Sequence, residues 1–179
     1  LSAKVLQAII DSKDEKLLAP LRTAVANRTM VNNAVFAAYQ QRKAGTDVYK
    51  YEVEQMKRSY MENYLGAMDS LLTVISSLEE GDIKDAWDGT RYGKLLDGCR
   101  LKTPDDFDVV YPIDGSCLFF FRTLPIQREV IDTRLGDYYD KVEDNDRVTS
   151  MLNLCLAKKV VATALRRFDI LECPATIRN

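Results

Sequence analysis

The fold is decided by the stretch Tyr49–Leu78, which reads YKYEVEQMKRSYMENYLGAMDSLLTVISSL. Its hydrophobic side chains recur at steps of three or four residues, the spacing of one face of an α-helix. They are Tyr49, Val53, Met56, Tyr60, Tyr64, Met68, Leu71, Ile75 and Leu78. The pattern predicts one long helix with a single buried stripe, capped at its start by Thr46 or Asp47 and ended by Gly81.

A second long helix is predicted just before this stretch. Pro20 suits its first turn, because the N–H that proline lacks would be unpaired there, and the helix should run to about Lys43, where Ala44-Gly45 ends it. Its buried side is expected to carry Leu21, Val25, Val31, Val35 and Tyr39. The short turn between the two long helices predicts an antiparallel hairpin.

Shorter signals precede the hairpin. Ser2 is expected to cap a helix that runs through Asp11, and Ser12 with Glu15 has the spacing of a capping box.

Glycines then concentrate in residues 81–115, at Gly81, Gly89, Gly93, Gly98 and Gly115. We expect an irregular segment there, with short helices at Ile83–Trp87 and Arg91–Leu96 and a short extended stretch at Phe107–Tyr111.

The last third of the chain returns to helix. Ser116 is expected to cap a helix through Phe119–Phe121 that Pro125 breaks or restarts and that ends near Thr133. An acidic connector, Asp137–Asp146, should follow Gly136, and an extended tail, Asp169–Asn179, should end the chain. Between them a final helix is predicted, with Asp144, Asn145 and Asp146 at its start. Its expected buried face is Val148, Met151, Leu152, Cys155, Leu156, Val160, Val161, Ala164 and Phe168.

These elements predict an all-α protein with a single domain over residues 1–179. It should consist of a helical hairpin (1–80), an irregular connector (81–115) and a C-terminal helical part (116–179) that packs on the hairpin. A length of 179 residues, with 46% hydrophobic and 29% charged residues, is typical of one globular domain.

The composition excludes several classes of function. The chain has no histidine, so Ser-His-Asp hydrolases, HExxH zinc hydrolases and histidine-ligated di-iron bundles are ruled out. A net charge of −2 gives no general attraction for a phosphate backbone. No run of about 20 apolar residues stands out, so we expect no membrane-spanning segment. A cytoplasmic or virion location is expected.

Metal and cofactor sites are not expected either. The cysteines at 99, 117, 155 and 173 form no CxxC pair, and we expect free, mostly buried thiols. The acidic residues between 132 and 146 lack the EF-hand pattern and indicate a solvated loop and helix cap. The segment Gly89–Lys94 lacks the spacing of a phosphate-binding P-loop.

One segment resembles a catalytic motif. Asp114-Gly115-Ser116-Cys117-Leu118-Phe119 is similar to the nucleophile segment of the ovarian-tumour-type deubiquitinases, Asp-Gly-x-Cys-Leu-Phe. The resemblance implies a reactive Cys117 at a helix start, but that family needs a histidine base, which this chain lacks. The alternative interpretation is a turn and a capped helix whose Cys117, Phe120 and Phe121 enter the core.

A second resemblance rests on the layout of residues 116–179. It comprises Ser116–Arg122, Pro125–Val130, Arg134–Asp137 and a last helix that ends in Ala164–Ile170. This arrangement is similar to small helical proteins of the head–tail connector or adaptor type from tailed bacteriophages and prophages. The resemblance implies a ring-forming or stacking subunit with no substrate.

The preferred hypothesis is therefore a non-enzymatic structural or assembly protein that contacts other protein chains, as a homo-oligomer. Phe119–Phe121 are hydrophobic residues beyond what one hairpin face can bury, and they favour an oligomer or a partner groove. One alternative is a cysteine-dependent hydrolase centred on Cys117. The other is a nucleic-acid-binding helical module that uses Lys158, Lys159, Arg166 and Arg167, or base stacking on the tyrosines of the 49–78 stripe.

Overall fold

The computed structural model describes residues 1–44, 49–142 and 145–178, and throughout these residues the protein is helical with no strand. This confirms the predicted fold class. The first elements are α1 (Ala3–Ser12), α2 (Glu15–Lys43), α3 (Lys50–Ser76), α4 (Asp82–Asp88), α5 (Arg91–Leu96) and α6 (Pro104–Val110). They are followed by α7 (Cys117–Val130), the π-helical turn η1 (Ile131–Leu135), α8 (Gly136–Lys141), α9 (Asp146–Arg167), the 3-10 turn η2 (Ile170–Glu172) and α10 (Ala175–Arg178).

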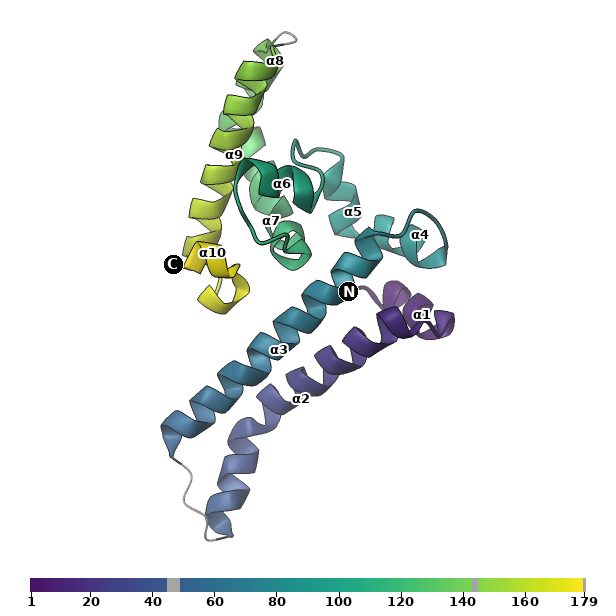
Figure 1. Ribbon diagram of the computed structural model, residues 1–179, viewed down its shortest axis with the longest axis vertical. Helices are drawn as coiled ribbons and strands as arrows, with labels where there is room; N and C mark the ends of the chain where they lie inside the picture. Colours follow the sequence, from purple (N-terminus) through teal and green to yellow (C-terminus); the bar gives the residue numbers. More distant parts are fainter. Residues whose placement is uncertain (45–48, 143–144, 179) are drawn as a thin grey trace.

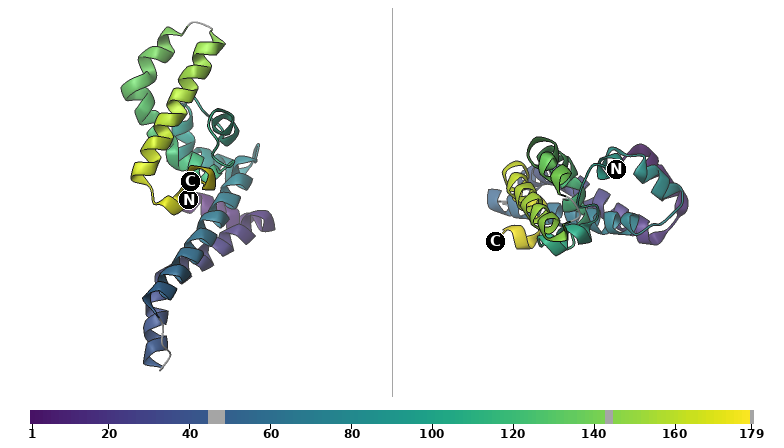
Figure 2. Two further views of the ribbon diagram at one scale, coloured as in Figure 1. Left: turned by 60° about the vertical axis from the view of Figure 1, so that its left-hand side comes forward. Right: turned by 90° about the horizontal axis from the view of Figure 1, so that it is seen from above.

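Helices α2 and α3 form the predicted antiparallel hairpin (Figure 1). One end of the hairpin lies beside α1, α4 and α7, where the main core is. The other end projects from the body as a two-helix arm, which is seen from a second side in Figure 2. Helix α3 faces the rest of the protein along part of its length, whereas α2 packs mainly on α3.

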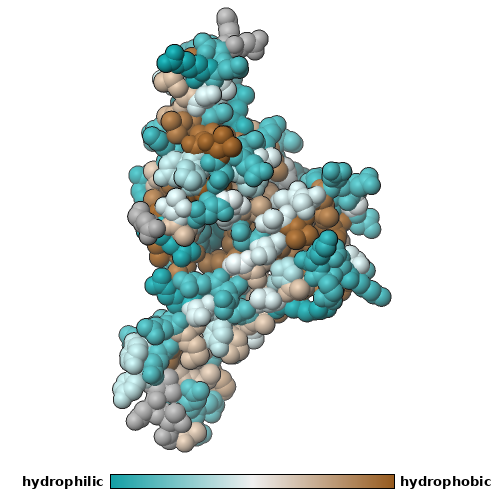
Figure 3. Space-filling view, in the orientation of Figure 1, coloured by the Kyte–Doolittle hydropathy of each residue, from teal (hydrophilic) through white to brown (hydrophobic). Residues whose placement is uncertain are grey.

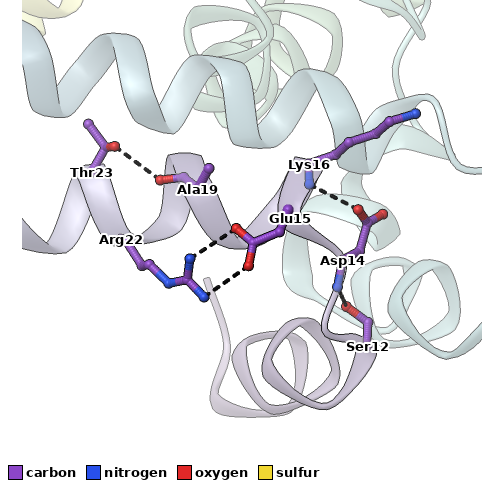
Figure 4. Close-up of polar contacts among 7 residues, drawn as sticks. All are labelled: Ser12, Asp14, Glu15, Lys16, Ala19, Arg22 and Thr23. Atoms are coloured by element: carbon purple, nitrogen blue, oxygen red, sulfur yellow. Dashed lines mark hydrogen bonds and ion pairs between the residues drawn. The ribbon is translucent and has the colours of Figure 1, made fainter.

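The junction of α1 and α2 differs from the prediction (Figure 4). Ser2 caps α1 as expected, but Asp14, not Ser12, caps α2, since its carboxylate accepts the Lys16 N–H at 2.9 Å. The Ser12 hydroxyl instead donates to the Ile9 carbonyl at 2.7 Å. Because α2 starts at Glu15, Pro20 lies in its second turn rather than its first. The predicted capping box is therefore wrong.

The buried side of α2 is also not the one expected. Val25, Val35 and Tyr39 are exposed, and Leu21 and Val31 are only half-buried. The buried residues are Leu17, Ala24, Ala34 and Ala38. Small side chains let the backbones of α2 and α3 approach closely, so the alanine face packs inward and the larger residues stay outside.

Helix α3 keeps most of the predicted stripe but is shorter. It begins at Lys50, next to Tyr49, and ends at Ser76 rather than at Gly81. The proposed caps Thr46 and Asp47 lie outside the described residues. Within the stripe, Val53, Leu71 and Ile75 are buried, Met56, Tyr60, Tyr64, Met68 and Leu78 are half-buried, and Tyr49 is exposed.

The glycine-rich segment is more regular than expected. The two short helices are confirmed as α4 and α5. Phe107–Tyr111 is not extended, because α6 covers most of it, with Thr103 and Asp106 forming a capping box and Pro104 in the first turn. Gly93 is needed for packing, since a Cβ there would lie 2.4 Å from the Asp88 carbonyl oxygen.

Helix α7 forms the centre of the core. It runs through Pro125 without a break, which corrects the predicted interruption. The side chains of Phe119, Phe120 and Phe121 are all buried, with the Phe121 ring edge-on to Trp87 at 4.9 Å between centroids. The three phenylalanines therefore fill the chain's own core and are not an open contact for a partner.

The C-terminal part contains two further corrections. The first half of the predicted acidic connector lies in helix α8, with Glu143 and Asp144 outside the described residues, and the predicted extended tail contains η2 and α10. Helix α9 is capped by Asn145 as expected. Its described core residues are Leu156, Ala157, Val160, Val161 and Ala164, whereas Val148 and Met151 of the expected buried face are exposed.

Helix α9 also satisfies, by length and composition only, the requirements for crossing a membrane. The expectation that the chain has no membrane-spanning segment stays a prediction for α9. However, its apolar face packs on α7, with Leu156, Val160 and Ala164 fully buried, and Lys158 and Lys159 lie in its middle. In this structure 28% of its most apolar stretch is buried inside the protein.

Candidate functional site

The segment that resembles a catalytic motif forms the start of α7. Asp114 and Gly115 both have positive φ, 57° and 63°, which makes the sharp turn before the helix. The Ser116 hydroxyl then caps α7, accepting the Phe119 N–H at 3.1 Å. A carboxylate from α3 joins this cap: Asp69 Oδ1 accepts the Ser116 hydroxyl at 2.9 Å and the Leu118 N–H at 2.7 Å.

Cys117 itself is held inside this arrangement. Its side chain is 5% exposed and borders a hollow of about 400 Å³ between α3, α4 and α6. Burial raises the pKa of the thiol, and this effect outweighs the hydrogen bonding by Thr73, which lowers it. A thiol with a raised pKa is protonated at neutral pH, whereas a nucleophile must be a thiolate. The structure thus gives the alternative interpretation: a turn and a capped helix whose Cys117 enters the core.

Two of the other three cysteines are likewise buried with raised pKa values. Burial raises the pKa of Cys99 to about 11 and raises that of Cys173, while Cys155 is half-buried. The expected burial of most thiols is confirmed. In the part of the chain that the structure describes, no group of three or more histidine, cysteine, aspartate or glutamate residues could hold a metal ion.

The charged residues that suggested other sites are engaged in ordinary ion pairs or face solvent. Asp132 pairs with Arg128 at 2.9 Å within one helical turn. Arg167 pairs with Glu129 through two hydrogen bonds, at 2.6 and 2.8 Å, which joins the end of α9 to α7. Lys158 and Arg166 are exposed on α9, and within the described residues neither cation lies over an aromatic ring.

Two buried contacts were not predicted. Gln127 on α7 is fully buried, and its Oε1 accepts the N–H groups of Arg100 and Leu101 at 3.0 and 2.8 Å while its Nε2 donates to the Leu101 carbonyl at 3.1 Å. Tyr139 on α8 donates to Asn153 on α9 at 2.9 Å. Both contacts fix the body of the protein and point to no ligand.

The most unusual surface is on the projecting arm. Val25, Val35, Phe36 and Tyr39 of α2 are 59%, 59%, 63% and 61% exposed. Apolar and polar surface alternate over this end of the molecule in Figure 3. Three of these residues, Val25, Val35 and Tyr39, belong to the side of α2 that the sequence pattern predicts to be buried. The alanine spacing, Ala24, Ala34 and Ala38, was the signal that could have identified the inner face.

Comparison of the chain with models of known protein families, with curated proteins and with solved structures finds no match.

Proposed function

We propose that this chain is a non-enzymatic structural or assembly subunit that binds other protein chains, and that the arm formed by α2 and α3 is its contact element. The observation that carries the proposal is the exposure of Phe36 and Tyr39, with Val25 and Val35, on a helix that packs mainly on its own hairpin partner. Large apolar side chains grouped on a projecting element are typical of surfaces that another protein covers.

The chemistry of the α7 start supports a non-catalytic role. Cys117 is buried with a raised pKa, and its neighbours Ser116 and Asp69 are used to cap the helix. The chain has no histidine to take the thiol proton. The hydrogen bonds of Asp69 with Ser116 and Leu118 join α3 of the arm to α7 of the core.

The finer form of the proposal is a head–tail connector-type subunit of a phage or prophage, located in a virion or in the cytoplasm during assembly. A compact helical body with a projecting hairpin suits an assembly subunit, since the arm can pack on a second copy while the body stays free for further contacts. The layout of residues 116–179 is the second support for this form.

The test is the native mass in solution, measured by sedimentation velocity or native mass spectrometry from about 1 to 100 µM, the range of ordinary protein association. A defined oligomer of the 20.4 kDa chain is expected. A monomer at every concentration would remove the homo-oligomer part of the proposal. Repeating the measurement at high salt separates apolar association, which persists, from charge-driven association, which weakens.

A further inference from the structure

Five side chains of α2 form a continuous row on the face turned away from α3. They are Val25, Thr29, Asn32, Phe36 and Tyr39, and we call them the α2 seam. Their steps of four, three, four and three residues are the spacing of a coiled-coil seam. All five are exposed. Helix α2 thus carries two such rows, one of mainly small residues buried against α3 and one open to solvent.

The lack of charged residues along the seam favours a second copy of this chain as the partner that covers it. From Thr29 to Gln41 the chain has no Asp, Glu, Lys or Arg. A surface without charge can meet a copy of itself with no like-charge repulsion, which a two-fold symmetric contact requires because the same patch serves both partners. A partner selected by charge would find nothing to recognise along this stretch.

The order of the side chains selects an orientation. In an antiparallel coiled coil, alternate seam positions of one helix face the complementary positions of the other. One register places Val25 opposite Phe36 and Thr29 opposite Asn32, which pairs apolar with apolar and polar with polar. In the same register Arg22, whose guanidinium donates to the Glu15 carboxylate of its own helix at 2.9 and 3.2 Å, lies opposite Tyr39, so the only charge at this end of the row is already paired within the chain. The next register along would place Asn32 opposite Phe36, a mismatched pair.

We propose that two copies of this chain associate through their α2 seams, antiparallel, with Val25 of each facing Phe36 of the other, so that the two arms form a four-helix bundle. This inference rests on the proposed function, since it specifies the surface and the partner of the assembly. The inner row of each α2 keeps its own α3, and the outer row is buried by the second copy.

Cysteine cross-linking tests the register. Val25→Cys and Phe36→Cys proteins are prepared separately, mixed and oxidised mildly. A disulfide should join the two variants at least tenfold faster than either variant joins to itself, because like positions are about 16 Å apart in this register. The matched control is Ala26→Cys mixed with Ala37→Cys, each one residue further along α2 and rotated by about 100° from the seam. Wild-type protein reports any linking through native thiols.

The outcomes separate the inference from the proposed function. Fast self-linking of Val25→Cys would indicate parallel association and overturn the inference. An oligomeric wild type whose arms do not cross-link, or link equally at the control positions, overturns the inference and leaves the proposed function intact. A monomeric wild type with no cross-linking overturns the inference and removes the homo-oligomer part of the proposed function.

A substitution at an exposed position of the seam tests the same contact without disturbing the fold of the single chain. Phe36→Asp, at an exposed site, should raise the dissociation constant of the dimer at least tenfold with an unchanged circular dichroism spectrum. Val109→Asp, on the 88% exposed Val109 of α6, should leave it unchanged. Equal effects of both substitutions, or an effect of neither, would overturn the α2 seam as the contact.

Discussion

The carboxylate of Asp69 on α3 accepts the backbone N–H of Leu118 on α7 at 2.7 Å. The same oxygen accepts the Ser116 hydroxyl, so a residue 47 positions away completes the helix cap. This contact ties helix α3 of the hairpin to the core helix α7. It also places a negative charge at the positive end of the α7 dipole.

Removing this carboxylate should destabilise the protein. Asp69→Ala leaves the Leu118 N–H without its partner, and we expect a loss of about 1–2 kcal/mol in the free energy of unfolding. Urea denaturation measures it. Asn63→Ala, at an exposed position of α3, is the matched control and should change stability by less than about 0.5 kcal/mol. Equal stability of the two variants would contradict the assigned role of Asp69.

Gln127 should be the most sensitive polar residue of the core. Gln127→Leu keeps most of the volume but strands the N–H groups of Arg100 and Leu101, which it now satisfies. We expect a loss of about 2–4 kcal/mol, because each buried unpaired group costs about 1–3 kcal/mol. Gln55→Leu, at an exposed site on α3, is the control. If Gln127→Leu unfolded at the same urea concentration as the wild type, water would be able to replace the hydrogen bonds of the amide.

Local patterns in the sequence predicted the elements that depend on near neighbours. The α3 stripe, the Ser2 and Ser116 caps and the two short helices α4 and α5 all follow from spacings within one or two turns. The α6 helix carried the same kind of signal, a capping box between Thr103 and Asp106, and was missed because Phe107–Tyr111 was read by its β-prone residues.

What the sequence could not settle was the choice between competing faces and distant partners. Helix α2 has an alanine row and a row of larger residues, and periodicity alone favours the larger one. The structure buries the alanines because close helix packing needs small side chains. The Asp69–Leu118 and Gln127–Leu101 contacts join residues 49 and 26 positions apart, beyond any local pattern.

The thiols should react in the order of their exposure and pKa. Cys155 is half-buried, whereas Cys99, Cys117 and Cys173 are buried with raised pKa values. At neutral pH we expect a thiol reagent to label Cys155 on the order of tenfold or more faster than Cys117. Peptide mass spectrometry of the labelled protein identifies the sites. Rapid labelling of Cys117 in the folded protein would instead favour the cysteine-enzyme alternative.

Tyr139 should make the protein lose stability at alkaline pH. Burial raises its pKa from 10.0 to about 12. The unfolded chain therefore loses this proton at lower pH than the folded protein does, so the stabilisation is complete below pH 10 and decreases as the pH rises toward 12. Denaturation at pH 8 and at pH 11 should show a smaller loss in Tyr139→Phe than in wild type. Equal losses would mean that Tyr139 ionises as freely as an exposed tyrosine.

The arm should open separately from the body. Between α2 and α3 of the arm lies a small cluster of buried residues that is separate from the main core, formed by Ala34, Ala38 and Val53. Ala38→Glu places a charge in that cluster, while Ala37→Glu adds the same charge at the exposed neighbouring position. Burial of an unpaired carboxylate is strongly unfavourable, so Ala38→Glu should increase hydrogen exchange of the amides in residues 30–43 and 50–60 at least tenfold. Protection in α7 and α9 should stay within about twofold, because these helices belong to a different cooperative unit. Ala37→Glu should leave both regions unchanged.

If Ala38→Glu instead accelerated exchange in α7 as much as in α2, the arm and the body would unfold together. The arm could then not act as a contact element that opens independently of the body.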